Sequence, residues 1–111
     1  MEPRNNLWIE SGEQVVLSRW RAALLAAVEE TGSISAAAER MGVQYRLAWE
    51  RLEKMENGLG VRLLHRHVGG AGGGGARLTP EGRDLVERFE RYAERVDAAM
   101  TNIFDEVFGG A

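Results

Sequence analysis

The chain has 111 residues, no cysteine and a net charge of −3, and 44% of its residues are hydrophobic, enough to bury a core. This length predicts one domain, residues 1–111, and the lack of cysteine excludes a disulfide framework and a thiolate metal site. No apolar run approaches the roughly 20 residues of a membrane span, and residues 1–6 are too polar for a secretion signal, so a cytoplasmic protein is expected.

Basic residues are concentrated in the middle of the chain. Residues 33–83 contain eight Lys or Arg and five acids, a local net charge of +3, whereas residues 84–111 contain three and seven, a local net charge of −4. Because exposed charges are screened within about 8 to 10 Å, an acidic average is compatible with a cationic binding face. The small local excess predicts modest non-specific affinity for nucleic acid, which falls with salt.

Two short apolar segments near the start of the chain predict a β-hairpin. Residues 7–9 and 15–17 flank a turn-like stretch at residues 10–14. A helix is expected to follow, capped by Ser18 and ended by Gly32.

Residues 33–57 have the pattern of a helix-turn-helix, two amphipathic helices joined by a tight turn. Gly42 can supply the left-handed conformation that ends the first helix. Ser33 or Ser35 can cap that helix and bring hydroxyls to the positive end of its dipole, where phosphates can sit. The second helix of such a pair fits the major groove of DNA. The alternative is a two-helix corner of a small α domain.

The first turn of the second helix is predicted to enter the groove. Gln44 can pair with adenine and Arg46 with guanine, while Tyr45 can donate to a phosphate or cover a thymine methyl. Arg51 is expected to contact the DNA backbone or to pair with a neighbouring glutamate. Trp49 is expected to be a core side chain rather than a base contact. The predicted buried stripe comprises Val43, Ala48, Leu52 and Met55.

Residues 61–78 are predicted to form a hairpin wing. One strand is expected at residues 61–67 and its return at residues 76–78. The seven residues between Val68 and Ala76 are glycines and one alanine, so they have almost no side chains with which to pack. Such a tip lets backbone amides approach DNA, and the predicted contacts at its base are Arg66, His67 and Arg77. The alternatives are a flexible linker and a phosphate loop, although the latter would end in Lys followed by Ser or Thr.

A long C-terminal helix over residues 80–108 is predicted from the capping sequence Thr79-Pro80-Glu81. Apolar residues recur along it at alternating steps of four and three, which is typical of a coiled-coil contact. The first turns are expected to pack on their own domain and the later turns on a twofold mate, so a homodimer is expected. The residues assigned to dimerisation are Phe89, Tyr92, Val96, Ala99, Met100, Ile103 and Val107.

Residues 18–85 resemble the N-terminal DNA-binding domain of LysR-type transcriptional regulators. The motifs that carry this resemblance are Leu52-Glu53, Leu59-Gly60-Val61, Leu63-Leu64, Arg66 and Leu78-Thr79-Pro80-Glu81-Gly82. A narrower resemblance, on residues 32–35, residues 45–49 and the glycine-rich wing, is to the ModE family of molybdate-responsive repressors. Together they imply a mainly α fold with small β elements, in which a winged helix-turn-helix has an N-terminal β-hairpin and a long C-terminal dimerisation helix. The implied dimer binds a palindromic operator near molybdenum transport or molybdenum-enzyme genes.

Two departures from the ModE pattern affect what the resemblance implies. ModE proteins that sense molybdate carry C-terminal molybdate-binding domains, which are not expected in these 111 residues. The open alternatives are a separate effector-sensing partner protein, another signal, or constitutive action. Gln44 stands where the family leads us to expect a capping serine, and Leu47 is less polar than the family leads us to expect. The base preference is therefore expected to differ from that of ModE proteins.

Catalysis is not expected, and neither a cofactor nor a metal is predicted. His65 and His67 share one face of the predicted strand, but a metal site needs a third ligand, and no arrangement for a serine or cysteine nucleophile is present. Two functions remain: a sequence-specific transcription regulator that binds double-stranded DNA as a homodimer, and a winged-helix protein-interaction module without DNA binding. The groove-facing polar turn favours the first, since an interaction module would more often expose an apolar patch.

Overall fold

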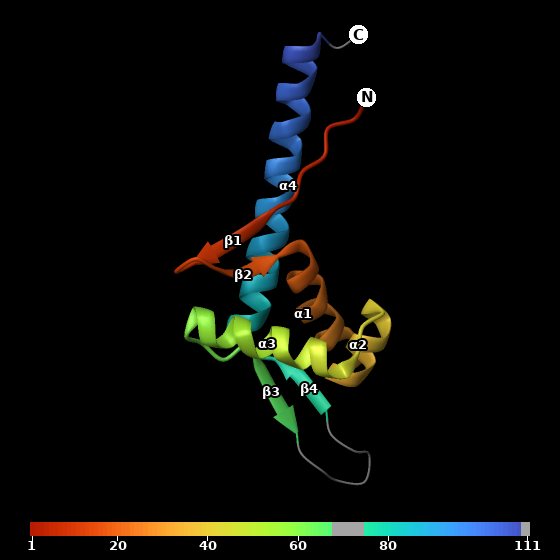
Figure 1. Ribbon diagram of the computed structural model, residues 1–111, viewed down its shortest axis with the longest axis vertical. Coiled ribbons are helices and arrows are strands. Elements are labelled where there is room, and N and C mark those ends of the chain that lie inside the picture. Colours follow the sequence, from red (N-terminus) through yellow and green to blue (C-terminus); the bar gives the residue numbers. More distant parts are fainter. Residues whose placement is uncertain (68–74, 110–111) are drawn as a thin grey trace.

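The computed structural model describes residues 1–67 and 75–109 and contains four helices and two small hairpins (Figure 1). In chain order the elements are β1 (Trp8–Ser11), β2 (Gln14–Ser18), α1 (Arg19–Thr31), α2 (Ile34–Met41), α3 (Tyr45–Leu59), β3 (Leu64–His67), β4 (Gly75–Leu78) and α4 (Pro80–Phe108). The β1–β2 and β3–β4 pairs are separate antiparallel sheets. This is the mainly α winged helix-turn-helix with an N-terminal hairpin and a long last helix that the sequence predicts.

Short polar side chains and glycines set the helix boundaries. The hydroxyls of Ser18 and Ser33 accept backbone N–H bonds, at 3.1 and 3.0 Å, from the first turns of α1 and α2. Gly32 and Gly42 end these helices in the left-handed conformation, with φ of 84° and 69°. The N-cap of α3, Gln44, makes no side-chain capping bond. The predicted boundaries of α1 and α2 are therefore confirmed, and Ser33 rather than Ser35 is the cap.

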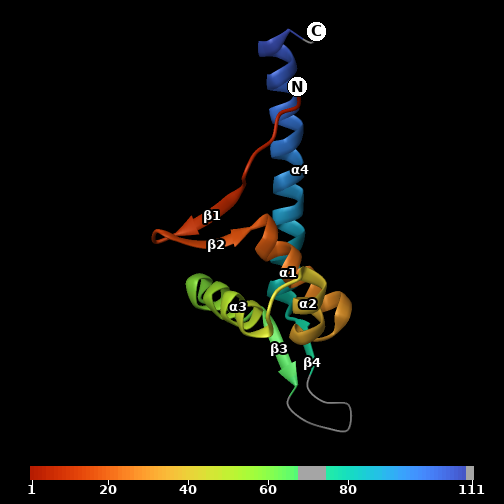
Figure 2. The same ribbon diagram turned by 45° about the vertical axis from the view of Figure 1, so that its right-hand side comes forward.

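The core lies where α1 meets α2, α3 and the first turns of α4 (Figure 2). From α3, Ala48, Leu52 and Met55 are fully buried as predicted, and Val43 is partly buried. The prediction that Trp49 is a core side chain is wrong, because 37% of its surface is exposed. Trp49 follows Ala48 directly, and one residue turns a side chain by about 100° around the helix axis.

The last helix runs far beyond the core, and it makes the molecule elongated, 60 × 28 × 23 Å (Figure 1). Its buried residues are Gly82, Val86, Phe89 and Ala93, all in its first half, which confirms that the first turns pack on their own domain. The assignment of Phe89 to a dimer contact is wrong, since Phe89 is 3% exposed and lies in the core of its own chain. Although α4 has 29 residues, no described helix is both long and apolar enough to cross a membrane.

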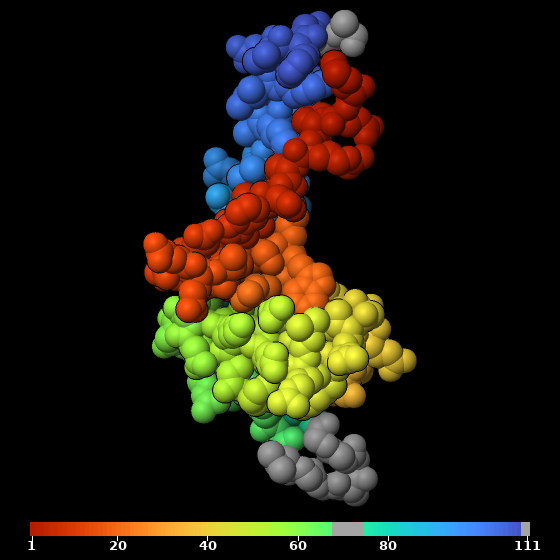
Figure 3. Space-filling view, viewed as in Figure 1, coloured from red at the N-terminus to blue at the C-terminus, as the bar shows by residue number. Residues whose placement is uncertain are grey.

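The segment before β1 lies along α4 and is held there by polar contacts (Figures 1 and 3). The side-chain amide of Asn5 donates to Asp97 Oδ1 at 3.0 Å. The guanidinium of Arg19, at the start of α1, donates to the same oxygen and to Asn5 Oδ1, each at 2.8 Å. One carboxylate therefore joins the N-terminal segment, α1 and α4.

We expect the attachment of this segment to depend on pH. The hydrogen bonds from Asn5 and then Arg19 lower the pKa of Asp97 below its ordinary value of 3.8. A lowered pKa in the folded state means that the contribution to stability is present above the unfolded pKa and is lost as the pH falls through the folded pKa. The side-chain amide signal of Asn5 in NMR spectra should therefore move to its free position below pH 3.8. In Asp97→Asn this titration should be absent, and an Asn5 signal that never moves would contradict the prediction.

Candidate nucleic-acid interface

The exposed side of α3 forms a large part of one face of the molecule (Figure 3). Its first turn carries the three residues predicted to enter a groove, and all three are exposed: Gln44, Tyr45 and Arg46. The side chain of Arg46 is 86% exposed and forms an ion pair with Glu50, one turn further on, at 3.4 Å. This turn is also the positive end of the α3 dipole, so its charge suits an anionic partner.

A hollow of about 330 Å³ joins the start of α2, the start of α3 and the base of the wing. It combines serine hydroxyls, a phenol, a guanidinium and an imidazole with the N-terminal end of a helix, and these groups can donate hydrogen bonds to phosphate oxygens. It brings together five of the nine residues predicted to contact DNA. Its lining residues are Ser33, Ile34, Ser35, Tyr45, Arg66, His67, Gly75 and Ala76.

The wing is fixed to the helix-turn-helix through its second strand. The backbone N–H of Ala76 donates to the carbonyl oxygen of Gly32, between α1 and α2, at 2.8 Å. Across the sheet His65 is paired with Arg77, and both are exposed. Arg66 is paired with the buried Ala76 on the opposite face. The predicted basic residues of the wing therefore lie on both of its faces. Of the glycine-rich tip predicted at residues 69–75, Gly75 begins β4 and the other six residues lie outside the described residues.

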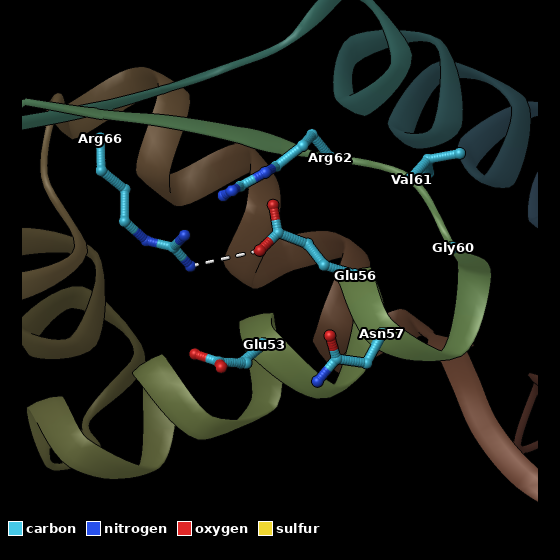
Figure 4. A pocket seen from close by; sticks show the side chains of 7 residues that line it. All are labelled: Glu53, Glu56, Asn57, Gly60, Val61, Arg62 and Arg66. Atoms are coloured by element: carbon cyan, nitrogen blue, oxygen red, sulfur yellow. Dashed lines mark hydrogen bonds and ion pairs between the residues drawn. The ribbon is translucent and has the colours of Figure 1, made fainter.

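Glu56 connects the wing to α3, a role that the sequence analysis missed (Figure 4). Its side chain is 10% exposed, and its carboxylate accepts backbone N–H bonds from Leu63 at 2.9 Å and Leu64 at 3.1 Å. Its other oxygen lies 3.4 Å from a terminal nitrogen of Arg66. These bonds hold the chain before β3 against α3, so the strand begins at Leu64 and not at Val61 as predicted. The sequence signal for this contact was a glutamate directly after the buried Met55 and an arginine ten residues later.

A second hollow of about 430 Å³ adjoins this contact and is mostly polar (Figure 4). Figure 4 shows the carboxylates of Glu53 and Glu56 on one side and the side chains of Arg62 and Arg66 on the other. Acidic and basic side chains therefore face one another across this hollow, whereas no acidic side chain lines the hollow at the start of α2. No three metal-ligating side chains gather anywhere within residues 1–67 and 75–109.

Arg51 of α3 lies near Arg21 of α1, and the two residues form one flank of the helix-turn-helix. Arg21 is partly buried, and that burial, followed by the charge of Arg51, lowers the pKa of Arg21. Within the described part of the chain, Arg51 forms no ion pair and the terminal nitrogen Nη1 of Arg21 has no hydrogen-bond partner. This flank is therefore cationic, and the alternative pairing of Arg51 with a glutamate is not found there.

The later turns of α4 present an apolar groove of about 640 Å³ together with the N-terminal segment. It contains five of the seven residues predicted to form a dimer contact, and Ile103 is 58% exposed. Phe104 and Phe108, which the sequence analysis did not assign, stack with ring centroids 4.8 Å apart. The groove is lined by Pro3, Arg4, Val96, Ala99, Met100, Ile103, Phe104, Val107 and Phe108. The sixth predicted residue, Tyr92, is exposed on the same helix.

Comparison with known proteins gives a consistent set of relatives. Residues 21–83 match the family model of bacterial regulatory helix-turn-helix proteins, lysR family. The chain is 46% identical to the molybdenum-pterin-binding protein MopB of Rhodobacter capsulatus, over 62% of this chain and 26% of that protein. It is 36% identical to the transcriptional regulator ModE of Yersinia pestis, over 78% of this chain and 33% of that protein.

Among solved structures, the complex of the CbnR DNA-binding domain with DNA superposes with a TM-score of 0.57 and 28% identity, over 71% of this chain and 85% of that one. The chain spans between a quarter and a third of the length of the two curated relatives, MopB and ModE.

Proposed function

The chain belongs to the lysR family of bacterial regulatory helix-turn-helix proteins, and from this premise we propose that it is a sequence-specific DNA-binding regulator of transcription. The observation that carries the proposal is the hollow in which Ser33, Tyr45 and His67 meet beside the exposed start of α3. A helix N-terminus, hydroxyls and cations on one exposed face suit a phosphate backbone, and the adjacent α3 suits a major groove. The solved structural neighbour is a complex with DNA, which supports DNA binding by this fold.

In this proposal the contacts divide into two classes. Gln44 and Arg46 read base edges in the major groove, where Gln pairs with adenine and Arg with guanine. Residues at the hollow, on the wing and on the cationic flank of α3 contact the backbone and set the register. The proposed backbone contacts are Ser33, Ser35, Tyr45, Arg51, Arg66, His67 and Arg77.

We further propose that residues 1–111 act as one DNA-binding unit and that two copies associate through the apolar groove of α4. A groove of this size on the second half of α4, which lies beyond the core, suits a second copy of that helix, since apolar burial drives such association. A twofold dimer presents two α3 helices, so the operator is an inverted repeat with half-sites about one helical turn apart. Since the relatives include ModE and MopB, the regulated genes are those of molybdenum transport or molybdenum enzymes.

Selection from a random duplex library at low and moderate salt, followed by sequencing, tests the proposal. Enrichment of an inverted repeat is the expected result. If folded protein enriches no sequence at either salt concentration, the chain is instead a winged-helix protein-interaction module.

Two arginine substitutions should separate base reading from backbone contact. Arg46→Ala should lower affinity for the selected duplex by roughly tenfold and leave affinity for a scrambled duplex nearly unchanged. Arg77→Ala should weaken both duplexes alike and reduce the salt slope by about 1. Arg77 suits this test better than Arg66, because Arg66 also holds the wing to α3. Fluorescence anisotropy with both duplexes measures the effects, and equal losses from both substitutions would contradict the assignment.

A further inference from the structure

The outermost ridge of α3 is more acidic than a DNA-reading helix needs to be. Arg46, Glu50 and Glu53 follow one another at steps of four and three, and Glu50 has no place in the contacts proposed above. At about 100° per residue, Arg46 and Glu50 lie nearly opposite the buried stripe of Leu52 and Met55. If α3 enters a groove with its exposed side first, these two side chains therefore reach deepest.

Glu50 forms an ion pair with Arg46 that leaves hydrogen-bonding atoms of both side chains available to DNA. It joins Glu50 Oε1 to Arg46 Nε at 3.4 Å, and the two side chains are 45% and 86% exposed. Within the described residues, neither side chain makes another side-chain hydrogen bond. The two terminal nitrogens of Arg46 are therefore available to donate to a guanine, and Oε2 of Glu50 is available to accept from another donor.

A carboxylate at this depth discriminates strongly between bases. It accepts hydrogen bonds and donates none, so it is repelled by the major-groove acceptors of guanine and thymine. The amino groups of cytosine and adenine are the donors available there, and adenine places its N7 acceptor beside the amino group. Cytosine is therefore the base that suits Glu50.

We propose that Glu50 is a specificity-determining residue that accepts a hydrogen bond from N4 of a cytosine, close to the guanine bound by Arg46. This inference rests on the proposed function, because it requires α3 to lie in the major groove. Side chains four residues apart on a helix are about 5 to 6 Å apart, and base pairs are stacked every 3.4 Å. The cytosine thus lies about two base-pair steps from the guanine.

The test compares sequences selected by the native chain, Glu50→Ala, Glu50→Gln and the matched control Glu53→Gln, all checked for folding by circular dichroism. We expect one C·G position in the native motif to lose its preference in Glu50→Ala and to shift toward adenine in Glu50→Gln, while Glu53→Gln keeps the native motif. Changing that C·G pair to T·A should cost the native chain roughly tenfold in affinity and Glu50→Ala almost nothing.

The possible failures are distinguishable. If the native chain enriches no motif, the proposed function fails, and this inference falls with it. If the native chain enriches a motif that Glu50→Ala leaves intact, the inference alone is overturned. It is equally overturned if Glu50→Ala alters the preference at the guanine position instead, because Glu50 would then act by orienting Arg46. A loss of the cytosine preference in the control Glu53→Gln would overturn it as well.

Discussion

Replacing Ile103 with glutamate is expected to convert a dimer into a monomer and to lower affinity for an inverted-repeat duplex by about 100-fold. Ile103 is exposed in the isolated chain and lies in the middle of the apolar groove of α4. A glutamate there costs the folded monomer little, because its carboxylate stays in water. In a dimer the same carboxylate would be buried without a partner, which is strongly unfavourable.

Sedimentation equilibrium gives the mass, and anisotropy titrations with one and two half-sites give the affinity. Ala98→Glu is the matched control, because Ala98 is exposed on the same helix but points away from the groove. It should leave both the mass and the affinity unchanged. A native chain that is monomeric throughout, or an Ile103→Glu variant that still dimerises, would refute the assigned contact.

Gly82→Ala is expected to lower the free energy of unfolding by about 2 to 3 kcal/mol. Gly82 is buried in the first turns of α4, and a Cβ added there would lie 2.4 Å from the carbonyl oxygen of Leu63 and 3.3 Å from Leu78 Cβ. That carbonyl already accepts the backbone N–H of Thr79 at 2.9 Å. The hydroxyl of Thr79 in turn donates to Arg62 O and accepts from Gly82 N, at 2.7 and 2.9 Å. The added methyl group therefore disturbs the whole junction between the wing and α4.

The sign of the effect makes this a sharp test. In an unobstructed helix interior, replacing glycine with alanine increases stability by up to about 1 kcal/mol. Urea denaturation followed by circular dichroism should show a loss for Gly82→Ala and a change within about 0.5 kcal/mol for the neighbouring exposed control Glu81→Ala. A gain in stability from Gly82→Ala would mean that the Leu63 carbonyl moves freely.

The helix boundaries were predictable because they depend on local chemistry. Ser18, Ser33 and Thr79 accept from backbone N–H groups three residues away, and Gly32 and Gly42 adopt a conformation that few other residues tolerate. Such interactions involve neighbours in the sequence. Residue types at the right spacing were therefore enough to place α1, α2 and the start of α4.

Features that depend on distant parts of the chain were not predictable in the same way. The exposure of Trp49 depends on how α3 is rotated against α1 and β2, which its apolar character does not reveal. Glu56 looks like an ordinary surface acid of a helix until β3 folds against it. In the candidate interface, the sequence predicted the first turn of α3 and most of the hollow, but neither the Glu56 contact nor the pair of Arg21 and Arg51.

The position of Trp49 also gives the protein an optical reporter of its own. Trp49 is one of three indoles and stands on the outer side of α3, whereas Trp8 lies on the β1–β2 hairpin and Trp20 is partly buried in α1. With Trp8 and Trp20 changed to phenylalanine, the tryptophan emission would come from α3 alone. A duplex covering that helix would quench this emission, so DNA titrations could be followed in unlabelled protein.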